Sequence, residues 1–167
     1  MEAREKYIVT GLAGFIWSSG VRMSVLHGCF VAAYDKLTYA VSRMSHESIP
    51  DECMDFVRGD VCETEPVDDT FVNYDTDAVF HITAMSHGDR SIYALAKFIR
   101  TNINETFLLL TESLRYNDAL SGEKKSSFRF LNVSTDEVYS LLYSATKAAN
   151  HTVSATHLAY SQTLCHT

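Results

Sequence analysis

The sequence has few of the residues that interrupt regular structure or staple a fold covalently. Only two prolines and one tryptophan occur among 167 residues, and no stretch is of low complexity, so neither a linker nor a second domain is indicated. The four cysteines include no Cys-x-x-Cys pair, which argues against a zinc ribbon and favours a reducing cytoplasm. We therefore expect one domain over residues 1–167.

Positive charge and long apolar runs are also scarce. The net charge is −7, and the most basic segment, GEKKSS at 122–127, reads as a solvated loop, so a nucleic-acid partner is not expected. No apolar run approaches the roughly 20 residues that span a bilayer, and the N-terminus carries no signal-peptide pattern, so no membrane association is expected. The histidines near Cys165 match no zinc spacing, and no metal is expected.

Five short β-rich runs alternate with longer helical patterns. Alternating strands and helices predict an α/β fold, a Rossmann-like doubly wound parallel sheet of about five strands with flanking helices, truncated after the fifth strand. The runs look apolar enough for strands that are buried on both faces. A long helix is expected after the fourth run, with apolar residues spaced from Ile92 to Leu114, followed by a polar loop from Asn117 to Lys125. The five runs are KYIVTG (6–11), CFVAAYD (29–35), MDFVRGD (54–60), DAVFHIT (77–83) and FRFLNVS (128–134).

The first chemical motif follows the first run. Gly11 and Gly14 stand where the strand should turn into a helix, and unpaired N–H groups at a helix N-terminus bind phosphates. The second run ends in Asp35, whose carboxylate can accept hydrogen bonds from ribose hydroxyls, which favours NAD over NADP. The alternative is a structural turn with a surface aspartate. Trp17 stands where such turns carry a third glycine; either the helix tilts outward or the turn is rebuilt, using Gly20.

The second motif follows the fifth run. STDEVY (134–139) precedes YSATK (143–147), and a Tyr-x-x-x-Lys pair places both side chains on one helix face. A neighbouring ammonium favours the phenolate, so Tyr143 can act as a base near neutral pH. Outside such a context, Asp136 and Glu137 would read as an exposed loop with two acids.

With these motifs the sequence resembles the extended short-chain dehydrogenase/reductases, and within them the bacterial dTDP-glucose 4,6-dehydratases. The resemblance runs over nearly the whole chain. Its blocks are VTGLAGFI (9–16), YDKLTYA (34–40), GDVC (59–62), AMSHGDRSI (84–92), FIRTNINET (98–106), KKSSFRFLNVSTDEVY (124–139) and YSATKAA (143–149).

The resemblance implies an NAD-dependent lyase that dehydrates a nucleotide-sugar of the dTDP-glucose class. Tyr143, assisted by Lys147, would remove the C4 hydroxyl proton while hydride leaves C4. Glu137 would then abstract the C5 proton and Asp136 would protonate the departing C6 hydroxyl, before hydride returns to C6. Thr135 would hydrogen-bond the C4 oxygen. Two adjacent acids suit this division of roles, because close carboxylates push their pKa values apart.

The resemblance also implies a cofactor pocket and a dimer. Ser86 and Thr135 would face the substrate, while Asp60 or Thr101 could instead simply cap a helix. Two copies would associate through helices at 91–117 and 143–160. The residues implied in cofactor binding are Gly11, Gly14, Phe15, Ile16, Asp35, Lys36, Thr38, Asp60, Val61, Ala84, Ser86, Thr101, Tyr143 and Lys147.

The sequence departs from the family pattern in several places. Besides Trp17, these are Met85, Gly88 and the spacing of only eight positions between Thr135 and Tyr143. No counterpart of the family's C-terminal substrate lobe is expected. Three functions stay open at this point: a nucleotide-sugar dehydratase, a catalytically degenerate dinucleotide-binding or dimerisation module, and a non-functional fragment.

Overall fold

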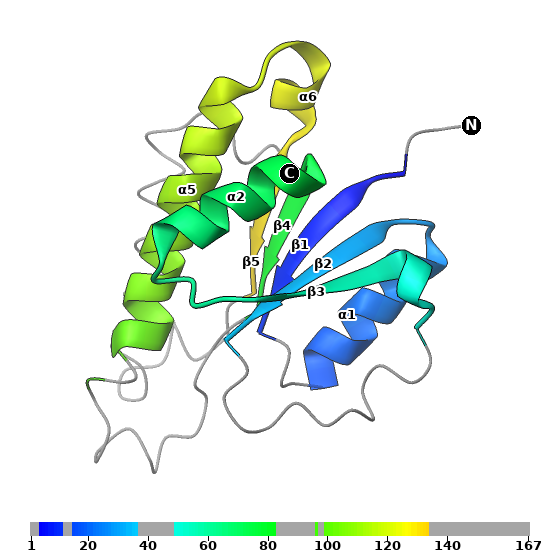
Figure 1. Ribbon diagram of the computed structural model, residues 1–167, viewed down its shortest axis with the longest axis horizontal. Coiled ribbons are helices and arrows are strands. Elements are labelled where there is room, and N and C mark those ends of the chain that lie inside the picture. Colours follow the sequence, from blue (N-terminus) through cyan, green and yellow to red (C-terminus); the bar gives the residue numbers. More distant parts are fainter. Residues whose placement is uncertain (1–3, 12–14, 37–48, 83–95, 97–98, 134–167) are drawn as a thin grey trace, which may run out of the picture.

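The computed structural model describes residues 4–11, 15–36, 49–82, 96 and 99–133 (Figure 1). Within these residues five strands form one sheet in the order β3-β2-β1-β4-β5, and every neighbouring pair is parallel. The chain builds outward from β1 to β3 and then returns to the other side of β1 for β4 and β5. This order confirms the predicted Rossmann-like sheet. The strands are β1 (Lys6–Thr10), β2 (Phe30–Asp35), β3 (Met54–Arg58), β4 (Ala78–His81) and β5 (Arg129–Asn132).

Helices cover both faces of the sheet. Helix α1 lies on one face and helices α2 and α5 lie together on the other (Figure 1). A π-helical turn, η3, leads directly into α5. The bounds are α1 (Phe15–Leu26), η2, a short 3-10 turn (Asp51–Cys53), α2 (Thr64–Tyr74), η3 (Arg100–Glu105), α5 (Thr106–Ala119) and α6 (Gly122–Ser127).

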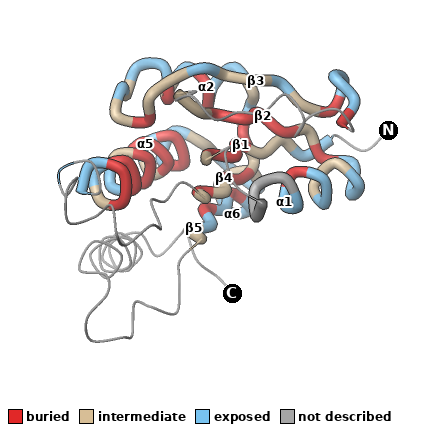
Figure 2. The backbone as a smooth tube through the Cα atoms, turned by 90° about the horizontal axis from the view of Figure 1, so that it is seen from below, coloured by how far each residue is buried: buried red, intermediate tan, exposed pale blue. Residues whose placement is uncertain are grey.

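Two apolar cores follow from this layering. On the α2/α5 face, Phe71 stacks on Tyr116 with ring centroids 5.1 Å apart, and Phe128 lies 6.4 Å and 5.6 Å from these two rings. On the α1 face, Val21 packs over Val9 and Val31. The buried residues follow the strands and the inner sides of the helices (Figure 2). Among the described residues, no helix combines the length and apolar character that crossing a membrane requires.

The two outer strands of the described sheet correct one expectation. β2 is buried along its centre, but β3 exposes Asp55 and Arg58, and β5 exposes Arg129 and Leu131. An outer strand has a neighbour on one side only, so its side chains are covered less completely than those of a central strand. The prediction that all five strands are buried on both faces was therefore wrong for β3 and β5.

The predicted polar loop from Asn117 to Lys125 was also wrong. Helix α5 continues to Ala119, and GEKKSS forms helix α6. Glu123 lies in the first turn of α6 and two lysines in its last, which suits the helix dipole. Lys124 forms ion pairs with Asp75 and with Asp77, the latter at 3.3 Å. These contacts, made by residues distant in sequence, hold a segment that local polarity alone assigns to a loop.

One buried polar side chain provides a stability prediction. Asn117 is fully buried, and neither its amide nitrogen nor its amide oxygen has a hydrogen-bond partner within the described part of the chain. An unpaired buried amide costs about 1–3 kcal/mol. Asn117→Leu, which has a similar branched shape, should raise the free energy of unfolding by about 1–2 kcal/mol in urea denaturation.

A control separates burial from helix propensity. Asn73→Leu makes the same change at an exposed position of α2 and should alter stability by no more than about 0.5 kcal/mol. An Asn117→Leu variant that is no more stable than Asn73→Leu would show that the amide is satisfied in solution.

Candidate functional site

The carboxyl ends of the strands form the edge where open α/β sheets bind their ligands. β1 ends at Thr10, and Gly11 follows with a φ of 87°, in the left-handed region that favours glycine. Helix α1 begins four residues later, at Phe15. A helix N-terminus close to the end of a strand presents backbone N–H groups that can receive a pyrophosphate.

A buried hydrogen-bonded chain fixes the end of β1. The hydroxyl of Thr10 lies 2.7 Å from Nδ1 of His81, and Nε2 of His81 lies 3.0 Å from the hydroxyl of Thr106. The imidazole is 1% exposed. The chain links β1, β4 and the start of α5, so the position of Gly11 is set by three elements at once.

Asp35 lies at the corresponding place on the neighbouring strand. It is the last residue of β2, and Thr10 of β1 is in register with Tyr34 of β2. The N–H of Gly59 donates to the Asp35 carbonyl over 3.1 Å, which ties the end of β2 to the segment that follows β3. The structure therefore brings Gly11, Asp35 and Asp60 to one edge, as the sequence predicts.

Four charged side chains form an ion cluster beside this edge. Lys36 Nζ lies 2.5 Å from an oxygen of Glu105 and 3.8 Å from an oxygen of Asp60. Arg100 donates to the other Asp60 oxygen over 2.8 Å. The Glu105 side chain is 2% exposed, whereas that of Lys36 is 31% exposed. We call these four residues the ion cluster.

Burial and charge set the protonation of these groups. Burial raises the pKa of Glu105, and the nearby Lys36 offsets this only in part. Burial alone would raise the pKa of Asp60, but the N–H of Cys62 and the cations Lys36 and Arg100 outweigh it, so the pKa lies below its ordinary value. Burial would lower the pKa of Lys36, but its bond to Glu105 and the two carboxylate charges raise it.

A metal ion would find three potential ligands in the same place. One oxygen each of Asp60 and Glu105 and the sulfur of Cys62 lie within 4.8 Å of one another. However, Lys36 is already in contact with Glu105 and close to Asp60, and burial raises the pKa of the Cys62 thiol. The negative charge is thus paired with a lysine, and the arrangement does not require a metal.

Helix α1 bears on one of the expectations for Trp17. α1 is continuous from Phe15 to Leu26 and contains both Trp17 and Gly20. The alternative in which Gly20 rebuilds the turn was therefore wrong, because Gly20 lies inside the helix. The tryptophan is compatible with helical backbone in the first turn of α1.

The remaining predicted residues divide into two groups. Val61 is buried in the α2/α5 core, and Thr101 is buried with its hydroxyl donating to Glu105 over 3.4 Å. Phe15 and Ile16 open α1. The others lie outside the described residues: Gly14, Thr38, Ala84, Ser86, Thr135, Asp136, Glu137, Tyr143 and Lys147.

Sequence reasoning missed Glu105, Arg100, Cys62 and His81. The apolar spacing from Ile92 to Leu114 is confirmed for Leu110, which is buried in the core, but it does not indicate the residues of η3, because a π-helical turn shifts which side chains face the sheet. Thr101, Asn102 and Glu105 are buried there, while Ile99 and Phe107 are 39% and 47% exposed. The sequence offered one signal for this site, since Glu105 is a charged residue within a helical pattern of apolar residues.

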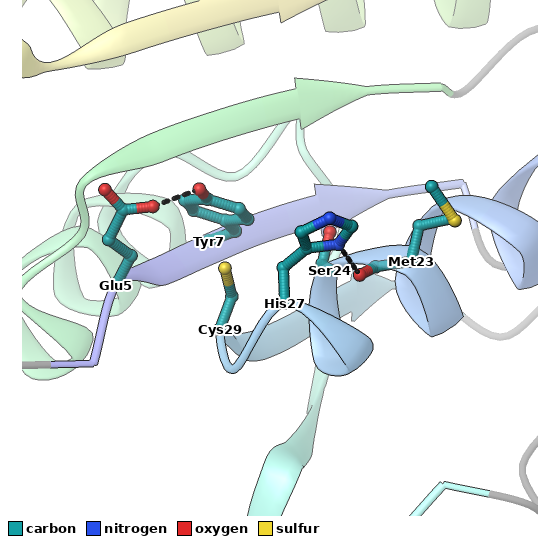
Figure 3. A pocket seen from close by; sticks show the side chains of 6 residues that line it. All are labelled: Glu5, Tyr7, Met23, Ser24, His27 and Cys29. Carbon is teal, nitrogen blue, oxygen red and sulfur yellow. Dashed lines mark hydrogen bonds between the residues drawn. The ribbon is translucent and has the colours of Figure 1, made fainter.

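A hollow of about 370 Å³ lies at the opposite edge of the sheet, where β1 begins and α1 ends (Figure 3). The Tyr7 hydroxyl donates to the Glu5 carboxylate, and Nδ1 of His27 donates to the Met23 carbonyl over 2.8 Å. Burial, followed by the contacts with Glu5 and Cys29, raises the pKa of Tyr7. These groups pair with one another or with backbone, and they lie away from Gly11 and Asp35.

Comparisons with known proteins agree with this geometry. The family model described as GDP-mannose 4,6 dehydratase matches residues 8–163. A dTDP-glucose 4,6-dehydratase of Haemophilus influenzae is 38% identical over 174 residues, covering 92% of this chain and 52% of the relative. dTDP-glucose 4,6-dehydratase 1 of Escherichia coli K12 is 45% identical over 136 residues, covering 80% and 38%. The chain thus spans about half the length of these curated relatives or less.

Solved structures show the same fold. A dTDP-glucose 4,6-dehydratase of Streptomyces venezuelae, solved with NAD and TYD bound, superimposes with a TM-score of 0.78 at 30% identity, covering 95% of this chain and 53% of that one. A UDP-Glc/GlcNAc 4-epimerase of Campylobacter jejuni reaches a TM-score of 0.80 at 19% identity, covering 97% and 51%. At that identity the second match concerns the fold alone.

Proposed function

This chain belongs to the GDP-mannose 4,6 dehydratase family, and on that basis we propose that it is the cofactor-binding and catalytic part of an NAD-dependent nucleotide-sugar 4,6-dehydratase. The observation that supports this best is the arrangement of Gly11 and Asp35 at the ends of adjacent parallel strands. We assign the substrate to the dTDP-glucose class because the relatives carry that name.

The residues present fit NAD. Gly11 with positive φ directly follows β1, at the edge where such sheets bind a pyrophosphate, and the Asp35 carboxylate suits a ribose 2′-hydroxyl and disfavours a 2′-phosphate. The fourteen cofactor-binding residues of the sequence prediction remain assigned as proposed. When bound, NAD supplies a hydride acceptor that later returns the hydride, so the overall reaction is redox-neutral.

The catalytic steps proposed for this chain concern protons. Tyr143, with Lys147 beside it, takes the proton of the C4 hydroxyl as C4 is oxidised to a ketone. The ketone acidifies C5–H, so Glu137 can take that proton while Asp136 protonates the C6 hydroxyl, which leaves as water. Thr135 hydrogen-bonds the C4 oxygen, and Ser86 contacts the sugar nucleotide. Hydride addition at C6, together with return of a proton to C5, then leaves C6 as a methyl group.

Further parts of the proposal concern the assembly and setting of the protein. We propose a single dinucleotide-binding domain over 1–167, and we propose that it lies in the cytoplasm. The described cysteines Cys29, Cys53 and Cys62 are free thiols, as a reducing compartment requires.

We also propose a homodimer through the helices at 91–117 and 143–160, which is supported by the exposed Ile99 and Phe107. Light scattering that finds a monomer at every concentration would contradict the dimer.

The second candidate is a dinucleotide-binding or dimerisation module without turnover. It is favoured by one observation, the spacing of only eight positions between Thr135 and Tyr143, which departs from the family pattern. Incubation of the purified chain with NAD⁺ and excess dTDP-glucose distinguishes the two candidates. The dehydratase yields the 4-keto-6-deoxy sugar nucleotide, detected by chromatography and mass spectrometry. Binding of NAD without any product would favour the module.

A further inference from the structure

Lys36 lies where its charge would affect the choice between NAD and NADP at this edge of the sheet. It directly follows Asp35, the last residue of β2, and the hydrogen bond from Gly59 to the Asp35 carbonyl holds the Asp60 segment next to it. An unpaired ammonium beside an adenosine ribose attracts a 2′-phosphate. Lys36 would therefore favour NADP if its charge were available.

In the ion cluster the charge of Lys36 is paired with carboxylates and is not available to a 2′-phosphate. Lys36 and Arg100 carry two positive charges, and Asp60 and Glu105 carry two negative charges, so the cluster has no net charge. The two carboxylates contact Lys36 differently. Asp60 forms its shorter ion pair with Arg100, whereas Glu105 contacts Lys36 at 2.5 Å.

Burial makes Glu105 the stronger partner. Its side chain is 2% exposed, so solvent and salt screen its interaction with Lys36 less than they screen a surface pair. Glu105 is also held by its surroundings, since it ends the π-helical turn and accepts a hydrogen bond from Thr101. The contact with Glu105 thereby fixes where the Lys36 ammonium lies.

We propose that Glu105 is a positioning residue that selects NAD over NADP by holding and neutralising Lys36. The inference rests on the proposed function, because it requires a dinucleotide at the Gly11–Asp35 edge. Asp35 repels a 2′-phosphate directly, whereas Glu105 acts through Lys36. Neutralising Glu105 should release the ammonium and change the preference without altering any group that contacts the pyrophosphate.

The test compares dissociation constants of NAD⁺ and NADP⁺ for the full chain by isothermal titration calorimetry. Glu105→Gln removes one charge at nearly constant volume. It should raise the affinity for NADP⁺ relative to NAD⁺ by about fivefold to tenfold, as expected for one charge acting over several ångströms in a partly solvated site. The gain should shrink at high salt. Glu105→Asp keeps the charge and should stay closer to the wild-type ratio.

A matched control lies in α5, the helix that η3 leads into. Like Glu105, Glu112 is a buried glutamate, but it pairs with Arg115 at 2.8 Å instead of with Lys36. Glu112→Gln should leave the ratio within twofold of the wild type. Lys36→Gln in combination with Glu105→Gln should abolish the gain, which a merely structural role of Glu105 would not predict.

The outcomes separate this inference from the proposed function. If the wild type binds NAD⁺ but Glu105→Gln and Glu112→Gln give the same ratio, Glu105 does not select the cofactor and the proposed function stands. If the wild type binds neither cofactor, both fail. If Glu105→Gln shows no cooperative thermal transition, Lys36→Gln alone tests the inference by removing the cation instead of its partner. This variant leaves two carboxylates and one cation in the ion cluster, so its affinity for NADP⁺ relative to NAD⁺ must fall. An unchanged or higher relative affinity for NADP⁺ would overturn the inference.

Discussion

Tyr143→Phe is expected to reduce formation of the 4-keto-6-deoxy product by about 10³-fold, near the middle of the range of about 10²–10⁴ for a general base. The phenyl ring keeps the shape of the side chain but has no oxygen to accept the C4 hydroxyl proton. Lys147 follows four residues later, and its ammonium stabilises a phenolate that the variant cannot form. Product is measured by chromatography at saturating NAD⁺.

The control for this prediction is another tyrosine. Tyr74→Phe removes a hydroxyl that donates to Asp55 of β3 and should leave product formation within twofold of the wild type. The binding of NAD⁺ should change little in Tyr143→Phe, because the proposed pyrophosphate and adenosine contacts are intact. Equal product formation by the two variants would remove Tyr143 from the proposed mechanism.

Gly59→Ala is expected to destabilise the protein and weaken NAD binding together. A Cβ atom at this position would lie 2.1 Å from the Tyr34 hydroxyl oxygen and 2.5 Å from the ring carbon that bears it. Tyr34 is 2% exposed in the α2/α5 core, so its ring cannot retreat without disturbing that core. Overpacking of this kind costs about 1–3 kcal/mol.

The functional effect follows from the same collision. Gly59 joins β3 to Asp60, and its N–H binds the Asp35 carbonyl. A shift of this segment misplaces both proposed adenosine contacts, and we expect the affinity for NAD⁺ to fall about tenfold or more. The measurements are urea denaturation for stability and calorimetry for affinity.

Gly20→Ala serves as the comparison for this prediction. Gly20 lies in α1, and the nearest atom to an added Cβ is a methyl carbon of Ile82 at 4.0 Å. Removing glycine from a helix interior should stabilise the protein by up to about 1 kcal/mol. A Gly59→Ala variant as stable as Gly20→Ala would show that the Tyr34 contact is not restrictive in solution.

The sheet could be predicted because its strands carry their own signal. In β1 and β2, apolar residues follow one another without charged interruption, as parallel strands covered on both faces require. The positions of Gly11 and Asp35 also followed, because the fold of the sheet brings the carboxyl ends of neighbouring strands together. Elements whose structure follows from their own residues could therefore be predicted from the sequence.

The ion cluster and helix α6 could not be predicted in this way. Glu105 is buried because η3 turns it toward the sheet and Lys36 meets it from 69 residues away. α6 is held by Lys124 contacting Asp75 and Asp77. In both cases partners distant in sequence override the local preference, and no spacing within the segment itself reveals them.

The central claim is that the edge formed by Gly11, Asp35 and Asp60 binds NAD, and thermal unfolding at increasing NAD⁺ concentration tests it most directly. A ligand that binds the folded state alone raises the unfolding midpoint by mass action. We expect a cooperative transition whose midpoint rises steadily with NAD⁺ in the wild type, and a clearly smaller rise in Asp35→Ala. A cooperative transition whose midpoint stays constant up to millimolar NAD⁺ would contradict the assignment.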